Sequence, residues 1–177
     1  KCMPNLAVVC SITRMCFSIP VLKKGADEHT VRMLQNALYK LGHHRVVFKS
    51  DQEPSIVALK HRVAKETPDR EFVMEESPVG DSQSDGLAEN SIREIQKQAR
   101  ILKLDIELHY QTKIETDHPV LAWLMTYAGQ VLCRCSIGSD GRSPWELCTG
   151  RKWKAPMIPF GETVDFMPER SGERKHN

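Results

Sequence analysis

One stretch decides how the chain folds, Arg45-Val46-Val47-Phe48-Lys49-Ser50-Asp51-Gln52-Glu53-Pro54. Its first part is short, apolar and β-branched, which favours a strand over a helix. Pro54 suits the first turn of a helix, where its missing N–H would have no partner anyway. Asp51 is therefore predicted to end a strand, and ligands of open α/β sheets bind outside the carboxyl ends of strands. Taken alone, Asp51 is also explained as a turn or helix-cap residue before Pro54.

Hydrophobic periodicity on both sides of this stretch predicts the other elements. On the N-terminal side it predicts a β-hairpin from apolar runs at 6–12 and 15–21, and a helix from Val31 to Leu41 that ends at Gly42. On the C-terminal side it predicts a helix at 54–66, a short strand at 72–74, an exposed loop at 77–86, helices beginning near Leu87, His118 and Ser143, and a strand at 161–166. This order predicts an α/β domain with a small mixed sheet and helices on its faces.

The composition fits one ordinary domain. The chain has 177 residues, of which 40% are hydrophobic and 27% charged, with a net charge of +2. That charge is too small to indicate nucleic acid by itself, so any DNA contact must come from local clusters. The six cysteines form no Cys-x-x-Cys pair, and we expect reduced, buried thiols in an intracellular protein. No apolar run reaches the roughly 18 residues of a membrane span, and we expect no membrane partner.

A second carboxylate, Glu89, opens the long predicted helix. It follows a loop that is rich in Pro, Gly, Ser and Asp and ends in Asp85-Gly86. Two carboxylates, one from a strand end and one from a helix, can share a divalent cation, and oxygen ligands suit Mg²⁺ or Mn²⁺. Taken alone, Glu89 is also explained as a first-turn glutamate that is favoured by the helix dipole.

Several motifs carry a family resemblance when they are taken together. They are Lys49-Ser50-Asp51-Gln52-Glu53-Pro54, then Gly80 with Ser82-Gln83-Ser84-Asp85-Gly86-Leu87-Ala88-Glu89-Asn90, then Gly141-Arg142-Ser143-Pro144-Trp145-Glu146-Leu147-Cys148-Thr149-Gly150, and Phe160-Gly161-Glu162. In this order they resemble the core of retroelement integrases, the D,D,E superfamily with an RNase H-like fold. The third and fourth motifs are similar to those of Ty1/copia and related retrotransposons. The resemblance covers roughly residues 5–168.

This resemblance implies a function and a site. Asp51 and Glu89 would be catalytic metal ligands for two Mg²⁺ or Mn²⁺ ions, which stabilise the attacking and leaving oxygens of an in-line displacement. The implied reactions are 3′-end processing of the element's DNA and its joining to target DNA. The implied partners are those two DNAs and further copies of the chain, in a dimer or higher oligomer. The family further implies a nuclear location and an origin in a larger polyprotein.

One departure from the family concerns its first catalytic aspartate, which lies on a strand ahead of the hairpin. No aspartate precedes Asp27, so we expect Lys1 to lie downstream of that strand and the chain alone to be inactive. The family's N-terminal zinc-binding region is absent as well. We expect His43-His44 to be a solvated turn and predict no zinc site. The predicted division is a core at 1–150, lacking its first strand, and a basic linker with the start of a C-terminal extension at 151–177.

The predicted nucleic-acid contacts lie on one helix and in two other segments. The helix face that holds Glu89 also holds Arg93, Gln96, Lys97 and Arg100, opposite an apolar stripe of Ile92, Ile95, Ala99 and Leu102. Such a face suits phosphate and base contacts, although a solvated face with ion pairs such as Glu89–Arg93 would look similar. Gln83 is a further candidate. The third segment is the patch Arg151, Lys152, Trp153 and Lys154, which could bind through charge and stacking or be a basic linker.

Two other readings stay open. The absent aspartate favours a decayed or domesticated integrase-like domain that only binds nucleic acid or assembles. A cut-and-paste transposase or a ribonuclease H would share the fold, but the turn and helix at 85–89 and the long helical tail argue against it. Helices at 87–113 and 118–136 would form the dimer contact, with an apolar surplus of Trp123, Leu124, Tyr127 and Leu132. Trp123 and Trp145 are otherwise predicted to pack in the core.

Overall fold

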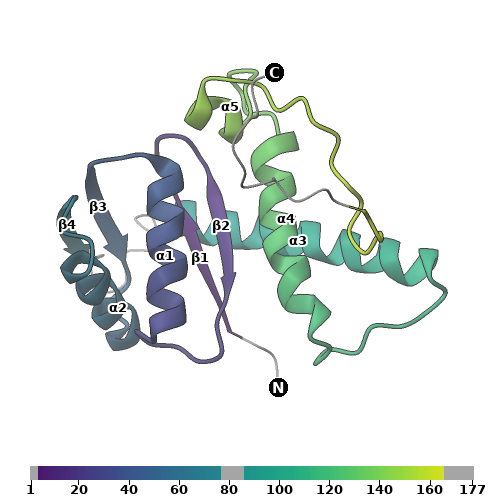
Figure 1. Cartoon of the computed structure of the whole chain (residues 1–177), viewed down its shortest axis with the longest axis horizontal. Coiled ribbons are helices and arrows are strands. Elements are labelled where there is room, and N and C mark those ends of the chain that lie inside the picture. Colours follow the sequence, from purple (N-terminus) through teal and green to yellow (C-terminus); the bar gives the residue numbers. More distant parts are fainter. Residues whose placement is uncertain (1–3, 77–85, 166–177) are drawn as a thin grey trace, which may run out of the picture.

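The fold was analysed in a computed structural model that describes residues 4–76 and 86–165 (Figure 1). Its elements are β1 Asn5–Val9, β2 Cys16–Pro20, α1 Glu28–Leu41, β3 Arg45–Ser50, α2 Pro54–Lys65, β4 Glu71–Glu76, α3 Gly86–His109, α4 Val120–Cys135 and α5 Pro144–Thr149. The predicted hairpin, the strand at 45–50, the short strand near 72–74 and every predicted helix are confirmed. The predicted loop at 77–86 lies, except for Gly86, outside the described residues.

Local sequence signals explain where the helices begin and end. Asp27 caps α1, because its Oδ1 accepts a hydrogen bond from the backbone N–H of Thr30 at 3.1 Å. Ser143 caps α5 in the same way, accepting from the N–H of Glu146 at 3.1 Å. At the other end of α1, Gly42 has φ of 72°, and its N–H donates to the carbonyls of Leu38 and Tyr39. Gly42 and Ser143 are helix-terminal residues that the sequence predicted, whereas the cap at Asp27 was not predicted.

Substitution of Gly42 with alanine should destabilise the protein by about 1–2 kcal/mol, because a Cβ is strained in the left-handed region. The space around Gly42 is open, so no packing clash adds to this cost. Gly86→Ala is the matched control, because Gly86 is the first residue of a helix and has open space around it. Urea unfolding of the two variants measures the difference. Equal loss in both variants would contradict the backbone explanation.

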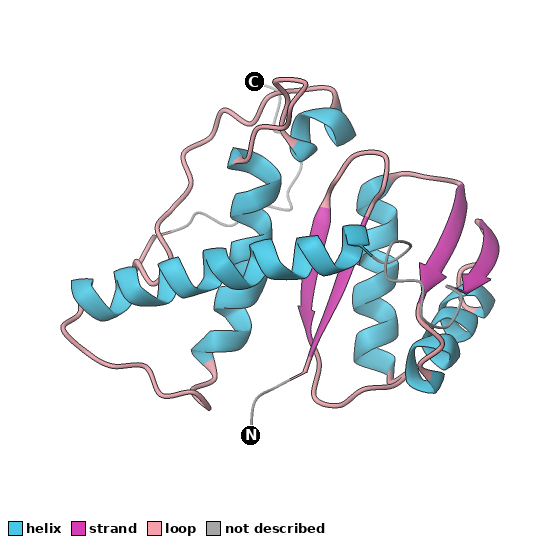
Figure 2. Cartoon of the chain, turned by 180° about the vertical axis from the view of Figure 1, so that it is seen from behind, coloured by secondary structure: helices cyan, strands magenta, loops and turns pink. Residues whose placement is uncertain are grey.

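The strands form two separate pairs in the part of the chain that is described. β1 and β2 pair antiparallel, with Leu6 opposite Ile19, and β3 and β4 pair parallel, with Val46 opposite Phe72. The predicted single mixed sheet is therefore divided. In both views α1 lies between the hairpin and the β3–β4 pair (Figures 1 and 2). Within residues 4–76 and 86–165, β1 and β3 are each hydrogen-bonded to one strand only.

Two hydrophobic clusters hold these layers together. The first cluster lies between the hairpin and helices α3 and α4, and includes Met15, Cys16, Ile95, Leu124 and Cys133. The second cluster lies beneath α1 and α2, and includes Val31, Leu34, Leu38, Leu59 and Val63. Leu6 and Val8 of β1 and Val46 and Phe48 of β3 all pack against the second cluster. The two strand pairs therefore share one helical layer although they share no hydrogen-bonded ladder.

Four details of the predicted packing were wrong. Residues 161–165 form no strand, because this segment lies along α3 and not along a strand edge, with Tyr110 Oη donating to the carbonyl of Gly161 at 2.9 Å. Ile92 is 39% exposed and lies at the margin of the apolar stripe. Trp123 is 73% exposed and is no core residue, whereas its neighbour Leu124, which was predicted to add to an exposed surplus, is only 2% exposed.

Candidate active site

Asp51 lies directly after the last residue of β3, at the carboxyl end of a parallel strand, as predicted. Its side chain is exposed. The next element starts at once, because Glu53 is the extended residue before α2 and Pro54 occupies the first turn. The turn that holds Asp51 is thus fixed by the strand on one side and the helix on the other.

A basic side chain from the connection between β2 and α1 reaches this turn. Lys24 Nζ donates to both carboxylate oxygens of Glu53, at 3.0 and 2.9 Å. The hydrogen bond with Glu53 is the main reason that the pKa of Lys24 is raised, and the charges of Glu53 and Asp51 add to it. Hydrogen bonds from Lys24 and Ser55 lower the pKa of Glu53. Glu53 is therefore engaged by a cation, and Asp51 lies in the field of the same ammonium group.

Glu89 lies in the first turn of α3 and is exposed. In both views the N-terminal end of α3 lies against the hairpin on the side that faces β3 (Figures 1 and 2). The helix packs on β1 and α4, with Ile95 and Ala99 buried, so the packing holds Glu89 on the outer surface. Both predicted carboxylates are thus accessible to solvent and to a ligand.

The donor set suits a hard cation only in part. Two exposed carboxylates supply the oxygen ligands that Mg²⁺ and Mn²⁺ prefer. Within residues 4–76 and 86–165, no three His, Cys, Asp or Glu side chains gather in a way that could hold a metal ion. Asp51 and Glu89 are therefore two exposed carboxylates, and a divalent ion bound by them would need further ligands.

The predicted polar face of α3 is present on the surface. Arg93, Gln96, Lys97 and Arg100 are all exposed. The ion pair on this face joins Lys97 to Glu94 at 2.7 Å. Gln96 and Arg100 also line an open pocket of about 250 Å³ between α3, the start of β1 and the start of α4. Gln83 lies outside the described residues.

Two further side chains beside this face were not predicted from the sequence. Lys103 and His118 line the same pocket as Arg100. Lys103 follows Arg100 by one helical turn, so continuing the helical wheel beyond Arg100 would have found it. His118 comes from the segment before α4, and only the packing of α4 on α3 brings it there. The pocket therefore adds Lys103, which pairs with Glu107 at 3.2 Å, and His118 to the side chains beside the predicted face.

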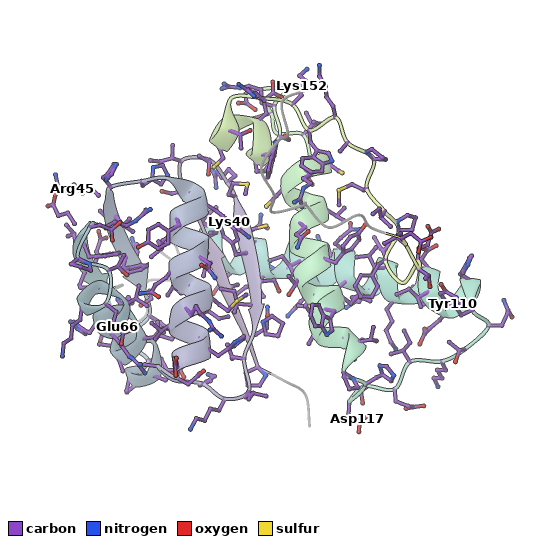
Figure 3. All side chains as sticks on the ribbon, viewed as in Figure 1. Lys40, Arg45, Glu66, Tyr110, Asp117 and Lys152 are labelled. Atoms are coloured by element: carbon purple, nitrogen blue, oxygen red, sulfur yellow. The ribbon has the colours of Figure 1, made fainter. Side chains whose placement is uncertain are left out.

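The basic patch after α5 is separate from this surface. Arg151, Lys152 and Lys154 are exposed, and Figure 3 shows Lys152 beside α5 and Asp117, which lines the pocket, at the other end of the molecule. Trp153 packs inside the protein, because the guanidinium of Arg134 lies 4.5 Å from its ring centroid and Trp145 meets it edge to face at 5.0 Å. These contacts cover part of the Trp153 ring, while the three basic side chains of the patch remain exposed.

Comparisons with known proteins agree on the fold. No family model matches the sequence, and no curated protein matches it. Among solved structures, the chain is similar to the catalytic core domain of BIV integrase, with 17% identity, a TM-score of 0.58, and coverage of 84% of this chain and 91% of that one. It is also similar to the HTLV-2 integrase catalytic core domain in complex with magnesium, with 13% identity, a TM-score of 0.55, and coverage of 82% and 93%.

A larger assembly gives the same result. The chain is similar to one in the simian T-cell lymphotropic virus intasome in complex with the PP2A regulatory subunit B56 gamma, with 11% identity, a TM-score of 0.61, and coverage of 93% of this chain and 58% of that one. The chain therefore has the RNase H-like fold of integrase catalytic cores, as the sequence predicted. No helix among the described residues is both long enough and apolar enough to span a membrane.

Proposed function

We propose that the chain is the catalytic core of a retrotransposon-type integrase of the Ty1/copia kind, acting in 3′-end processing and in the joining of element DNA to target DNA. The observation that carries the proposal is positional. In a fold shared with integrase cores, Asp51 ends a parallel strand and Glu89 opens the long helix. Carboxylates at these two positions are the ones that the sequence resemblance assigns to metal binding.

The proposal includes one further strand between β1 and β3. A parallel pair of strands with a free edge is unusual, since parallel sheets are normally larger and buried. Leu6 and Val8 of β1 and Val46 and Phe48 of β3 pack against the same cluster, so a strand between them would rest on the same helical layer. If that strand runs parallel to β3, its carboxyl end lies beside Asp51. A carboxylate there would complete the ligand set for Mg²⁺ or Mn²⁺.

The exposed face of α3 is the proposed DNA surface. Lys and Arg side chains position a duplex through its phosphates, whereas amides read base edges. Arg93, Lys97 and Arg100 would take the first role and Gln96 the second. Arg151, Lys152 and Lys154 form a second cationic surface for the same partner. Self-association is part of the proposal, and α3 offers an exposed apolar surface for it in Ile101, Leu104 and Leu108, which are 61%, 58% and 71% exposed.

Arg100→Gln should weaken binding to duplex DNA of any sequence and reduce the slope of log K against log salt by about 1, because one phosphate contact is lost. Fluorescence anisotropy with a labelled duplex at several salt concentrations measures the slope. Arg45→Gln is the matched control, because Arg45 is an exposed arginine at the far end of β3 from Asp51 and pairs with Glu71. Equal changes in both variants would refute a specific role for α3.

A second candidate is an integrase-like domain that binds nucleic acid or assembles without catalysis. It is favoured by the incomplete set of metal ligands among the described residues. One experiment separates the two candidates. The protein, expressed with its own preceding reading frame, is incubated with duplex oligonucleotides and Mn²⁺. Joined products that require the metal support the integrase, while salt-sensitive binding without joining supports the second candidate.

A further inference from the structure

Two cysteines from distant parts of the chain meet in the core between the hairpin and α4. Cys16 is the first residue of β2 and Cys133 lies in the last turn of α4. Their Sγ atoms are 3.6 Å apart. The N–H of Cys16 donates to Cys133 Sγ at 3.2 Å, and the Cys133 thiol donates to the carbonyl of Cys16 at 3.1 Å. The two sulfurs thus contact each other, and the Cys133 sulfur also contacts the backbone of Cys16.

The backbones of β2 and α4 are held close at this point. Gly129 lies one helical turn before Cys133, and a Cβ at Gly129 would lie 3.6 Å from the Cβ of Ser18 in β2. Cys16 Sγ also lies 3.8 Å from the carbonyl of Gly129. Helix and strand therefore pack with almost no side chain between them, which is the close approach that a disulfide needs. Rotation of the two side chains is the movement required to bring the sulfurs to bonding distance.

We propose that Cys16 and Cys133 are a redox pair that closes to an intramolecular disulfide under peroxide and reopens with a dithiol. In the first step the Cys133 sulfur attacks one peroxide oxygen. The O–O bond breaks, the thiol proton leaves with the second oxygen as water, and a sulfenic acid forms. In the second step the Cys16 sulfur attacks the Cys133 sulfur. The S–O bond breaks and the departing hydroxide takes the Cys16 proton as a second water.

The environment assigns the first step to Cys133. The Cys16 N–H donates to its sulfur and the Cys16 side chain lies beside it, and these contacts lower the pKa of Cys133, while the contact with Cys133 and burial raise the pKa of Cys16. The thiolate is the reactive form of cysteine. The attacking sulfur and the resolving sulfur are therefore distinguished by their hydrogen bonds.

Other thiols provide internal controls. Cys135 is exposed, and Cys148 is partly buried in α5, with its sulfur 3.7 Å from the carbonyl of Lys40, which Figure 3 labels. Burial raises the pKa of Cys148, and charge on Cys10 or Cys133 adds to it. The test must distinguish Cys148 as a partner from Cys16 and Cys133. The pairing chemistry is independent of DNA integration.

The test oxidises the purified chain with hydrogen peroxide, blocks free thiols, digests the protein and maps linked peptides by mass spectrometry. We expect one linked pair, Cys16 with Cys133, that a dithiol removes, and a thermal midpoint raised by about 10 °C in the oxidised form. Cys148→Ser should leave the linkage unchanged, whereas Cys133→Ser should abolish it. A linkage between other cysteines, or oxidation of Cys135 alone, would overturn the proposal. Peptide mapping of the unsubstituted chain decides the matter even if Cys133→Ser fails to fold.

Discussion

Replacing Glu89 with glutamine should lower the rate of DNA joining by a factor on the order of 10³ in the protein that carries its preceding strand. Divalent ions stabilise the charge of a phosphoryl transition state by several kcal/mol, and each ~1.4 kcal/mol corresponds to a factor of ten in rate. Glutamine keeps the shape of the side chain but removes the charge that would bind the ion. Since Glu89 is exposed in the first turn of α3, the substitution should leave the fold intact.

The measurement is the yield of joined oligonucleotide against time in Mn²⁺, with circular dichroism as the check on folding. Glu94→Gln is the matched control, because Glu94 lies on the same helix and pairs with Lys97 at the surface. It should retain joining activity. Full activity in Glu89→Gln would remove Glu89 from the site, and equal loss in both variants would point to a general effect of charge on α3.

Leu124→Ala should lower the free energy of unfolding by about 2–5 kcal/mol, the range for a buried leucine that leaves a cavity. Leu124 is 2% exposed and belongs to the cluster between the hairpin, α3 and α4. That cluster holds α4 on β2, and therefore supports the position of α3 as well. The loss should be near the upper end of the range if α4 cannot move inward to fill the space.

Urea unfolding followed by tryptophan fluorescence measures this loss. The adjacent residue gives the control. Substituting Trp123 removes a larger side chain from the same helix, but that side chain is 73% exposed. Trp123→Ala should change stability by no more than about 0.5 kcal/mol, as is usual for surface sites. If Trp123→Ala costs as much as Leu124→Ala, the exposed face of α4 is covered in solution, for example by another copy of the chain.

Local signals made the fold largely predictable from sequence. Short β-branched runs with turn residues between them identified the hairpin and the strand at 45–50, and Gly42, Pro54 and Ser143 identified helix ends. These signals act over a few residues, so sequence separation does not weaken them. The division into two strand pairs was not predictable in this way, since pairing depends on which strands become neighbours. The strand predicted at 161–166 was wrong for the same reason, because residues 161–165 have no neighbouring strand to pair with.

The sequence predicted which residues the candidate site contains better than it predicted their contacts in three dimensions. The positions of Asp51 at a strand end and Glu89 in a first helical turn follow from local pattern. The engagement of Glu53 by Lys24 joins segments 29 positions apart, and no local pattern encodes it. The contact between Arg134 and the ring of Trp153 is likewise a tertiary one, which the basic and aromatic run at 151–154 does not reveal.

The two hydrophobic clusters have a consequence for how the chain comes apart. One joins the hairpin to α3 and α4, the other joins α1 and α2 to β3, and β1 is the strand that packs against both. Such a chain can lose β3, β4 and α2 in a sub-global opening while the rest stays folded, so its unfolding need not be all-or-none. Its tryptophans, Trp123, Trp145 and Trp153, all lie in or after α4. Tryptophan fluorescence therefore reports on one half of the molecule, whereas circular dichroism averages both halves. A difference between the unfolding midpoints from the two methods would measure the cooperativity between the halves.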